Sequence, residues 1–230
     1  MSIAENIARV RANIAAAAKE AGRDVSEITL VGASKMNDAD ACRQAIAAGI
    51  DVLGENREQE MTKKLAEHAY DGAPLHFIGH LQRNKVKNVV GKVAMIESVG
   101  SLELLSAIDK QAEKLGIVQD ILLEVNIGGE EAKSGFAPES LEQAAEEAKK
   151  CANVRVRGLM CIPPVAEGEH GSLPYLKSSC TFVDINAKLY DNTLDILSMG
   201  MSGDYEDAVR AGATMVRVGT AIFGARNYTI

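Results

Sequence analysis

The sequence predicts an α/β protein, a single (β/α)8 TIM barrel with an extra helix at its N-terminus. Three observations predict it: eight short apolar runs typical of strands, a helix-compatible segment after each run, and a chain of 230 residues. Strands that alternate with helices indicate βαβ units and a parallel sheet. Because eight such units fit a chain of this length at the small end of the barrel range, we expect one domain over residues 1–230.

A doubly wound open sheet is the alternative fold for alternating strands and helices. That fold usually has fewer strands, and it often carries a G-x-G-x-x-G turn after the first one. Here the first predicted strand is followed by "SKMND", which contains no glycine. The sequence therefore favours the barrel.

The first element is predicted to be an amphipathic helix, because Ile3, Ile7, Val10 and Ile14 recur at helical spacing. This segment lacks the basic start and the uninterrupted apolar stretch of a secretory signal peptide. The strands that follow are expected at Ile28–Ser34, Val52–Gly54, Leu75–Gly79, Ala94–Ser98, Ile121–Asn126, Val156–Cys161, Ile196–Met199 and Met215–Gly219.

Several of the helices between these strands are marked by the residues at their ends. Asp38 precedes a segment that stops at Gly49, and Ser101 precedes one that stops at Gly116. Polar side chains at the start and a glycine just past the end are typical of helix termini. Pro138 lies near the first turn of a further segment, where proline is tolerated.

The composition excludes several classes of protein. The net charge of -7 argues against nucleic acid as the main partner, because phosphate binding normally leaves a basic footprint. No stretch approaches the roughly 18 apolar residues of a membrane span. The four cysteines form no C-x-x-C pair, so we expect no metal site and reduced thiols in a cytoplasmic protein.

The loops after the last two predicted strands are typical of a phosphate site. "SMGMSGD" places Ser202 between two glycines, and "RVGTAIFG" places Gly219 and Thr220 where the eighth strand passes into its helix. Backbone N–H groups beside a small hydroxyl residue can bind an anion, and barrels hold phosphate at this corner. The alternative is a pair of ordinary glycine-serine turns.

Lys35 follows the first predicted strand directly, so it is expected at the same end of the barrel. Partial desolvation there makes the neutral amine available as a nucleophile, which can form a Schiff base with an aldehyde. A phosphate site beside such a lysine suggests pyridoxal 5′-phosphate or a sugar phosphate. The alternative is a lysine that extends into solvent.

Arg217 bears on the choice of ligand. It lies two residues before Gly219 on the eighth predicted strand, so both residues point to the same face. An inward arginine below the phosphate could approach the pyridine nitrogen of pyridoxal, where cofactor sites use an Asp or an Arg. The alternative is an ion pair with a strand-end acid such as Glu55 or Glu124.

Six motifs occur in one order between Leu30 and Arg226: "LVGASK", "GENREQE", "HFIGHLQRNK", "VNIGGEEAKSG", "GLMCIPP" and "LSMGMSGDYEDAVRAGATMVRVGTAIFGAR". With them the chain resembles the pyridoxal phosphate homeostasis proteins, which are related to the N-terminal barrel of alanine racemase. The resemblance implies a fold-type III pyridoxal-phosphate-binding barrel. It assigns cofactor contacts to Lys35 (Schiff base), Asn56 (lining the cofactor), Arg217 (near the pyridine nitrogen), and Ser202, Gly219 and Thr220 (phosphate).

The resemblance also implies a function. Members hold pyridoxal phosphate as a lysine aldimine without significant catalytic turnover. They maintain the intracellular pool of pyridoxal phosphate and the balance of amino and keto acids. We expect the same here, with PLP-dependent apoenzymes as possible partners of a monomer or weak homodimer. One alternative is an amino-acid racemase; it would need the β-rich second domain of racemases, for which the sequence leaves no room after the eighth unit. A Schiff-base aldolase acting on a sugar phosphate is the other alternative.

Overall fold

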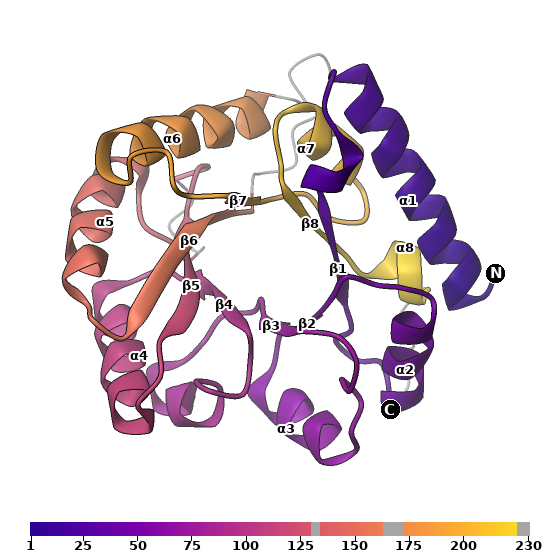
Figure 1. Ribbon diagram of the computed structural model, residues 1–230, viewed down its shortest axis with the longest axis horizontal. Helices are drawn as coiled ribbons and strands as arrows, with labels where there is room; N and C mark the ends of the chain where they lie inside the picture. Colours follow the sequence, from indigo (N-terminus) through magenta and orange to yellow (C-terminus); the bar gives the residue numbers. More distant parts are fainter. Residues whose placement is uncertain (130–133, 163–172, 225–230) are drawn as a thin grey trace.

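A computed structural model of the chain describes residues 1–129, 134–162 and 173–224. Its centre is a closed barrel in which each strand pairs with the next and the first pairs with the last (Figure 1). All eight pairings are parallel. The strands are β1 (Thr29–Ala33), β2 (Val52–Glu55), β3 (Leu75–Phe77), β4 (Met95–Val99), β5 (Gln119–Val125), β6 (Val154–Cys161), β7 (Ile196–Ser198) and β8 (Met215–Val218).

The eight predicted strands are therefore confirmed, with ends that shift by two residues at most. Helices surround the barrel in Figure 1. They are α1 (Ile3–Glu20), α2 (Ala39–Ala47), α3 (Glu58–Ala66), α4 (Leu102–Leu115), α5 (Leu141–Lys150), α6 (Leu173–Leu189), α7 (Tyr205–Arg210) and α8 (Thr220–Phe223), with 3-10 turns η1 (Val25–Glu27), η2 (Arg83–Asn88) and η3 (Pro138–Ser140).

In the third unit the helix-compatible segment forms the short 3-10 helix η2 instead of an α-helix. The predicted ends of α2 and α4 were confirmed, whereas Pro138 begins the 3-10 turn η3 that precedes α5. The Asp38 and Ser101 side chains accept hydrogen bonds from the amides of Ala41 and Leu104. Gly116 ends α4 in the left-handed region with φ 65°, where a glycine avoids the strain of a side chain.

The N-terminal helix α1 lies beside α7, α8 and α2 and covers the seam where β8 meets β1 (Figure 1). The buried Asn6 amide donates to the Ile222 carbonyl at 2.8 Å, and Asn13 donates to the Tyr205 hydroxyl at 2.9 Å. The first helix of the chain is therefore joined by hydrogen bonds to its last two.

The barrel interior changes from apolar to polar along its axis. Its apolar part consists of two small clusters, Val31 with Val52 and Met215, and Met95 with Leu122 and Met160. Two residues further along β4, β5 and β8, the inward positions are held by Glu97, Glu124 and Arg217, because inward residues recur with a period of two. A layer of buried charged groups thus lies between the apolar floor and the carboxyl ends of the strands.

None of the helices in the described ranges is long and apolar enough to cross a membrane.

Candidate functional site

Lys35 lies two residues beyond the end of β1, in a tight turn toward α2. Met36 takes a positive φ of 62°, and the Asn37 amide donates to the Ser34 carbonyl at 3.1 Å. The Met36 amide donates to Glu60 on α3 at 2.8 Å. Lys35 itself is half-buried. Its position continues the inward series Val31 and Ala33, so the turn carries the lysine at the barrel mouth.

A buried cluster holds the peptide just before Lys35. The Lys64 ammonium donates to the Ser34 carbonyl at 2.8 Å and to Glu55 Oε1 at 2.6 Å. Glu55 Oε1 also accepts from the Ser34 hydroxyl at 2.6 Å and from the Tyr70 hydroxyl at 3.0 Å. Burial and the charge of Glu55 raise the pKa of Tyr70, so its hydroxyl stays a donor. The sequence analysis missed this cluster.

The predicted phosphate corner is organised by Ser202, which follows β7. Its hydroxyl oxygen accepts hydrogen bonds from the amides of Gly219 at 3.0 Å and Ala221 at 3.3 Å. The O–H of Ser202 can still donate to an anion while its oxygen accepts. Thr220 is exposed and Gly219 is half-buried, so the corner is open to solvent.

The closure of the barrel brings Lys35 and this corner together. β1 pairs with β8 through Val31 with Arg217 and Gly32 with Val218. One step further, the position of a Cβ on Gly219 would lie 3.3 Å from the Ala33 carbonyl oxygen. A side chain there would narrow the space between the strand ends. Residues far apart in the sequence thus form one edge of the barrel mouth.

Arg217 lies in the barrel interior below this edge and is 5% exposed. Its guanidinium donates to the Ser198 hydroxyl at 2.5 Å and to the Cys161 carbonyl at 3.0 Å. The acid that faces it is Glu97 on β4, with 4.0 Å between Nη1 and Oε2. The alternative partners Glu55 and Glu124 were therefore wrong, because Glu97 is the acid whose inward position on β4 reaches Arg217.

Glu97 is fully buried and is the centre of a second polar group. Its carboxylate accepts from His76 Nδ1 at 2.7 Å and from the Ser198 hydroxyl at 2.7 Å. Burial would raise the pKa of Glu97, but the hydrogen bond and charge of His76, with Arg217 and Ser198, outweigh it and lower the pKa. The sequence analysis missed Glu97, although a charge inside the apolar run "AMIES" was the signal.

Asn56 follows β2 at the inward position after Gly54 and is half-buried. Its side-chain oxygen Oδ1 is buried and accepts no hydrogen bond from the described residues. Its backbone is packed against the end of β3, since a Cβ on Gly79 would lie 2.3 Å from the Asn56 carbonyl oxygen. Asn56 is therefore held by β3 while one of its polar atoms lacks a partner.

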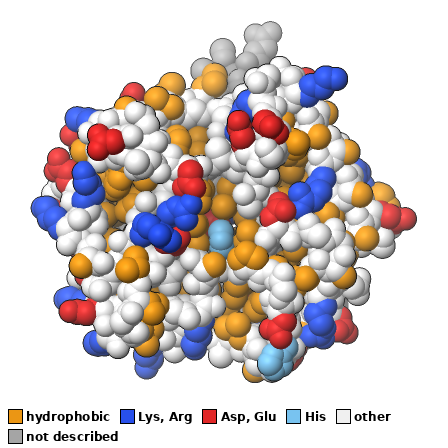
Figure 2. Space-filling model, in the orientation of Figure 1, with side chains coloured by type: hydrophobic (Ala, Val, Ile, Leu, Met, Phe, Trp, Pro, Cys, Tyr) orange, Lys and Arg blue, Asp and Glu red, His pale blue; other side chains and the backbone are white. Residues whose placement is uncertain are grey.

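The structure gathers the predicted residues on four neighbouring strands. Lys35 and Asn56 follow β1 and β2, while Ser202, Arg217, Gly219 and Thr220 belong to β7, β8 and the turns after them. Acidic and basic side chains are mixed over the face seen in Figure 2. In the described part of the chain, no group of three or more His, Cys, Asp and Glu side chains could hold a metal ion.

Residues 6–227 match the family of the alanine racemase N-terminal domain. A pyridoxal phosphate homeostasis protein of Aquifex aeolicus is 43% identical over 99% of this chain and 100% of its own. The chain belongs to the pyridoxal phosphate homeostasis protein family. The homeostasis protein of Escherichia coli K12 is 37% identical, over 99% of this chain and 98% of its own.

Solved structures agree with this family. The protein PipY of Synechococcus elongatus, solved with pyridoxal phosphate bound, matches with a TM-score of 0.83 and 31% identity over 97% of this chain and 100% of PipY. Alanine racemase of Clostridium difficile matches with a TM-score of 0.72 and 18% identity, over 96% of this chain and 57% of the racemase. The racemase likeness is one of fold.

Proposed function

We propose that this pyridoxal phosphate homeostasis family member binds pyridoxal 5′-phosphate covalently through Lys35. One observation carries the proposal, namely the β1–β8 pairing that sets the Lys35 turn beside Gly219 and Ser202. An amine and an anion-binding corner then share one edge of the barrel mouth. A phosphorylated aldehyde is the ligand class that uses both.

The residues present fit this cofactor. The buried Asn56 oxygen without a described donor fits a polar group of a ligand, because such atoms are nearly always hydrogen-bonded. Ser202, Gly219 and Thr220 are proposed to hold the phosphate. Arg217, fixed by Ser198 and Glu97, is proposed to face the pyridine nitrogen, where its permanent charge keeps that nitrogen unprotonated.

When bound, the cofactor supplies an aldehyde that a lysine can hold as a Schiff base. The chain's own contribution is to position the amine. Lys64 fixes the Ser34 carbonyl, and the Met36 amide is fixed by Glu60, so the turn carrying Lys35 is held on both sides. Such a fixed turn favours capture of the aldehyde at one place.

We further propose that the protein is a carrier in pyridoxal phosphate homeostasis, without significant turnover of its own. Racemisation needs a second acid-base group opposite the lysine, and Arg217 at the ring nitrogen disfavours deep carbanion chemistry. The names of the relatives support the homeostasis role. We propose that residues 1–230 act as one domain, inside the cell, as a monomer or weak homodimer that supplies PLP-dependent apoenzymes.

The test is a visible absorbance spectrum of the purified protein with pyridoxal phosphate, followed by borohydride reduction and mass mapping. We expect a Schiff-base band, a phosphopyridoxyl label on Lys35, and loss of both in Lys35→Ala. The matched control Lys63→Ala, at an exposed lysine of α3, should keep the label on Lys35. A label distributed over surface lysines would contradict the proposal, and steady turnover of an amino acid would contradict the carrier role.

A further inference from the structure

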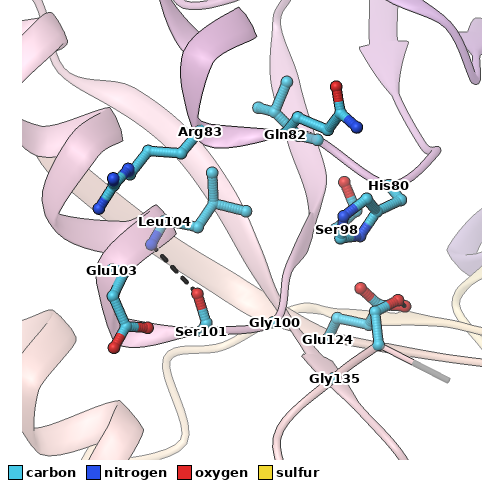
Figure 3. Close-up of a pocket in the computed structure, with 12 residues that line it drawn as sticks. His80, Gln82, Arg83, Ser98, Gly100, Ser101, Glu103, Leu104, Glu124 and Gly135 are labelled. Atoms are coloured by element: carbon cyan, nitrogen blue, oxygen red, sulfur yellow. Dashed lines mark hydrogen bonds between the residues drawn. The ribbon is translucent and has the colours of Figure 1, made fainter. Parts of the chain in front are cut away.

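A hollow of about 420 Å³ opens at the carboxyl ends of β3, β4 and β5 (Figure 3). It lies across the barrel from the strands β7, β8 and β1 that carry the phosphate corner. Its walls come from the turn after β3, the start of α4 and the end of β5. The residues that matter below are Leu81, Arg83, Ser101, Glu103, Leu104 and Glu124.

Glu124 forms the acidic end of the hollow. It is 5% exposed, and its Oε1 accepts from the Ser134 hydroxyl at 2.9 Å. Its other oxygen, Oε2, is buried and has no hydrogen-bond donor among the described residues. The carboxyl group extends toward the space that the labelled side chains enclose in Figure 3. An unsatisfied buried oxygen of this kind needs a donor, and the hollow is where a ligand can supply one.

The start of α4 lies beside this oxygen. It favours an anionic group, whereas the Glu124 carboxylate favours a cationic one. A Cβ on Gly100 would lie 3.2 Å from Glu124 Oε2, and Gly100 directly precedes the N-cap Ser101. Ser101 satisfies the Leu104 amide, while the other first-turn amides of a 14-residue helix face away from any intrahelical acceptor. Those amides and the helix dipole favour an anion.

Two further features complete the hollow. Arg83 extends along its α4 side and adds a positive charge near the helix start (Figure 3). The buried side chains of Leu81 and Leu104 supply apolar wall. A ligand that satisfies all of these groups has a cation and an anion close together and an uncharged side chain.

We propose that this hollow binds a free α-amino acid, with its ammonium group on Glu124 and its carboxylate at the start of α4 beside Arg83. Gly100 lies beside Glu124 Oε2 and directly precedes the N-cap of α4. The acidic group and the anion-binding helix start are therefore close enough for two charged groups attached to one carbon atom. Burial raises the pKa of Glu124, against smaller opposing effects of Ser134, His80 and Arg217. A bound ammonium compensates that burial by favouring the ionised carboxylate.

The test is calorimetric titration of the full chain, stripped of pyridoxal phosphate, with L-leucine. Two fragments of the same molecule serve as comparison ligands: 4-methylpentanoate lacks the ammonium, and 3-methylbutan-1-amine lacks the carboxylate. We expect saturable binding of L-leucine and at least tenfold weaker binding of each fragment, because each loses one charge-assisted contact. Absence of saturable L-leucine binding, or equal binding of either fragment, would overturn the proposal.

Variants locate the site. Glu124→Gln keeps the shape of the side chain and should weaken L-leucine binding at least tenfold. Arg83→Gln changes an exposed residue, so the fold should stay intact while L-leucine binding weakens severalfold. The matched control Glu103→Gln removes an acid from the helix start and should keep or tighten binding. Unchanged binding in Glu124→Gln would refute the assignment. Since the assay contains no cofactor, it succeeds or fails independently of the Lys35 label.

Discussion

Glu97 controls the position of Arg217 from the middle of the barrel. A lone charge at such depth would be costly, yet here one carboxylate accepts from His76 and Ser198 and faces the guanidinium. Ser198 in turn accepts from Arg217. The four side chains therefore support one another, and the arginine has one well-defined orientation below the barrel mouth.

Replacing Glu97 by glutamine is expected to lower the free energy of unfolding by about 3–5 kcal/mol at neutral pH, because it leaves a buried arginine without its counter-charge. Urea denaturation followed by circular dichroism measures this. Glu142→Gln, which breaks an exposed ion pair with Lys188, is the control and should cost less than about 1 kcal/mol. Equal effects of the two variants would show that Glu97 has no special role.

The same substitution has a predicted pH signature. The pKa of Glu97 is lower in the folded protein than its ordinary value of 4.5, so its stabilisation is complete above that value and is lost as the pH falls through the lower, folded value. The stability gap between wild type and Glu97→Gln should therefore narrow toward acid pH. Urea midpoints of both proteins at about pH 7 and about pH 4 test this. A gap that widens toward acid pH would contradict it.

Lys64 is expected to act on both stability and cofactor capture. Lys64→Met should cost about 3–5 kcal/mol, since it leaves the buried Glu55 carboxylate unpaired. It should also slow labelling of Lys35, because the Ser34 carbonyl loses its ammonium donor. Adding Glu55→Gln to Lys64→Met should recover part of the stability but not the rate of labelling. Denaturation and timed borohydride trapping separate the two effects.

At the residue scale, the sequence predicted the groups at the barrel edge but not their supports. Lys35, Ser202 and Gly219 were predicted to lie at one edge because strand ends in a barrel converge on one face. Glu97 and Lys64 were missed, because their roles depend on which inward or outward positions meet across several strands. A charged residue within a predicted strand does not reveal, from the sequence alone, which side chain it pairs with.

Among the elements, the strand ends depend on close backbone contacts as well as on side chains. Gly79→Ala is expected to cost about 3 kcal/mol, at the upper end of over-packing penalties, since the new methyl group would overlap the Asn56 backbone. It should also weaken pyridoxal phosphate binding by displacing Asn56. Thermal unfolding and cofactor titration measure the two effects. The control for stability is Gly203→Ala, because a Cβ there would meet nothing within 4 Å. An equal loss of stability in Gly203→Ala would contradict this account.

The elements themselves were largely predictable. A strand covered on both faces is a continuous apolar run, and eight such runs are easily found in the sequence. The third unit was different, because "QRNKVKN" has polar residues suited to a helix surface but forms only the 3-10 helix η2. η2 packs against α3 and α4, and such tertiary contacts cannot be inferred from the local sequence.

For the molecule as a whole, α1 is expected to hold the barrel seam closed. Asn6→Ala should lower the free energy of unfolding by about 1–3 kcal/mol, because it leaves the buried Ile222 carbonyl without its donor. Hydrogen exchange should rise in residues 215–224, and pyridoxal phosphate should bind more weakly. Lys19→Ala, an exposed change on the same helix, is the control. Exchange confined to α1 itself would contradict the coupling.

Because β1 pairs with β8, the barrel cannot close until synthesis of the chain has reached β8. About 180 residues separate the end of β1 from the start of β8, which corresponds to roughly 10–40 s of synthesis. During that time β1 is an open edge without its second neighbour, and such edges invite pairing with other chains. Lys35 and Gly219 meet only when the last strand arrives. A partly synthesised chain therefore lacks the complete barrel edge, and its β1 edge stays unpaired on one side until β8 is made.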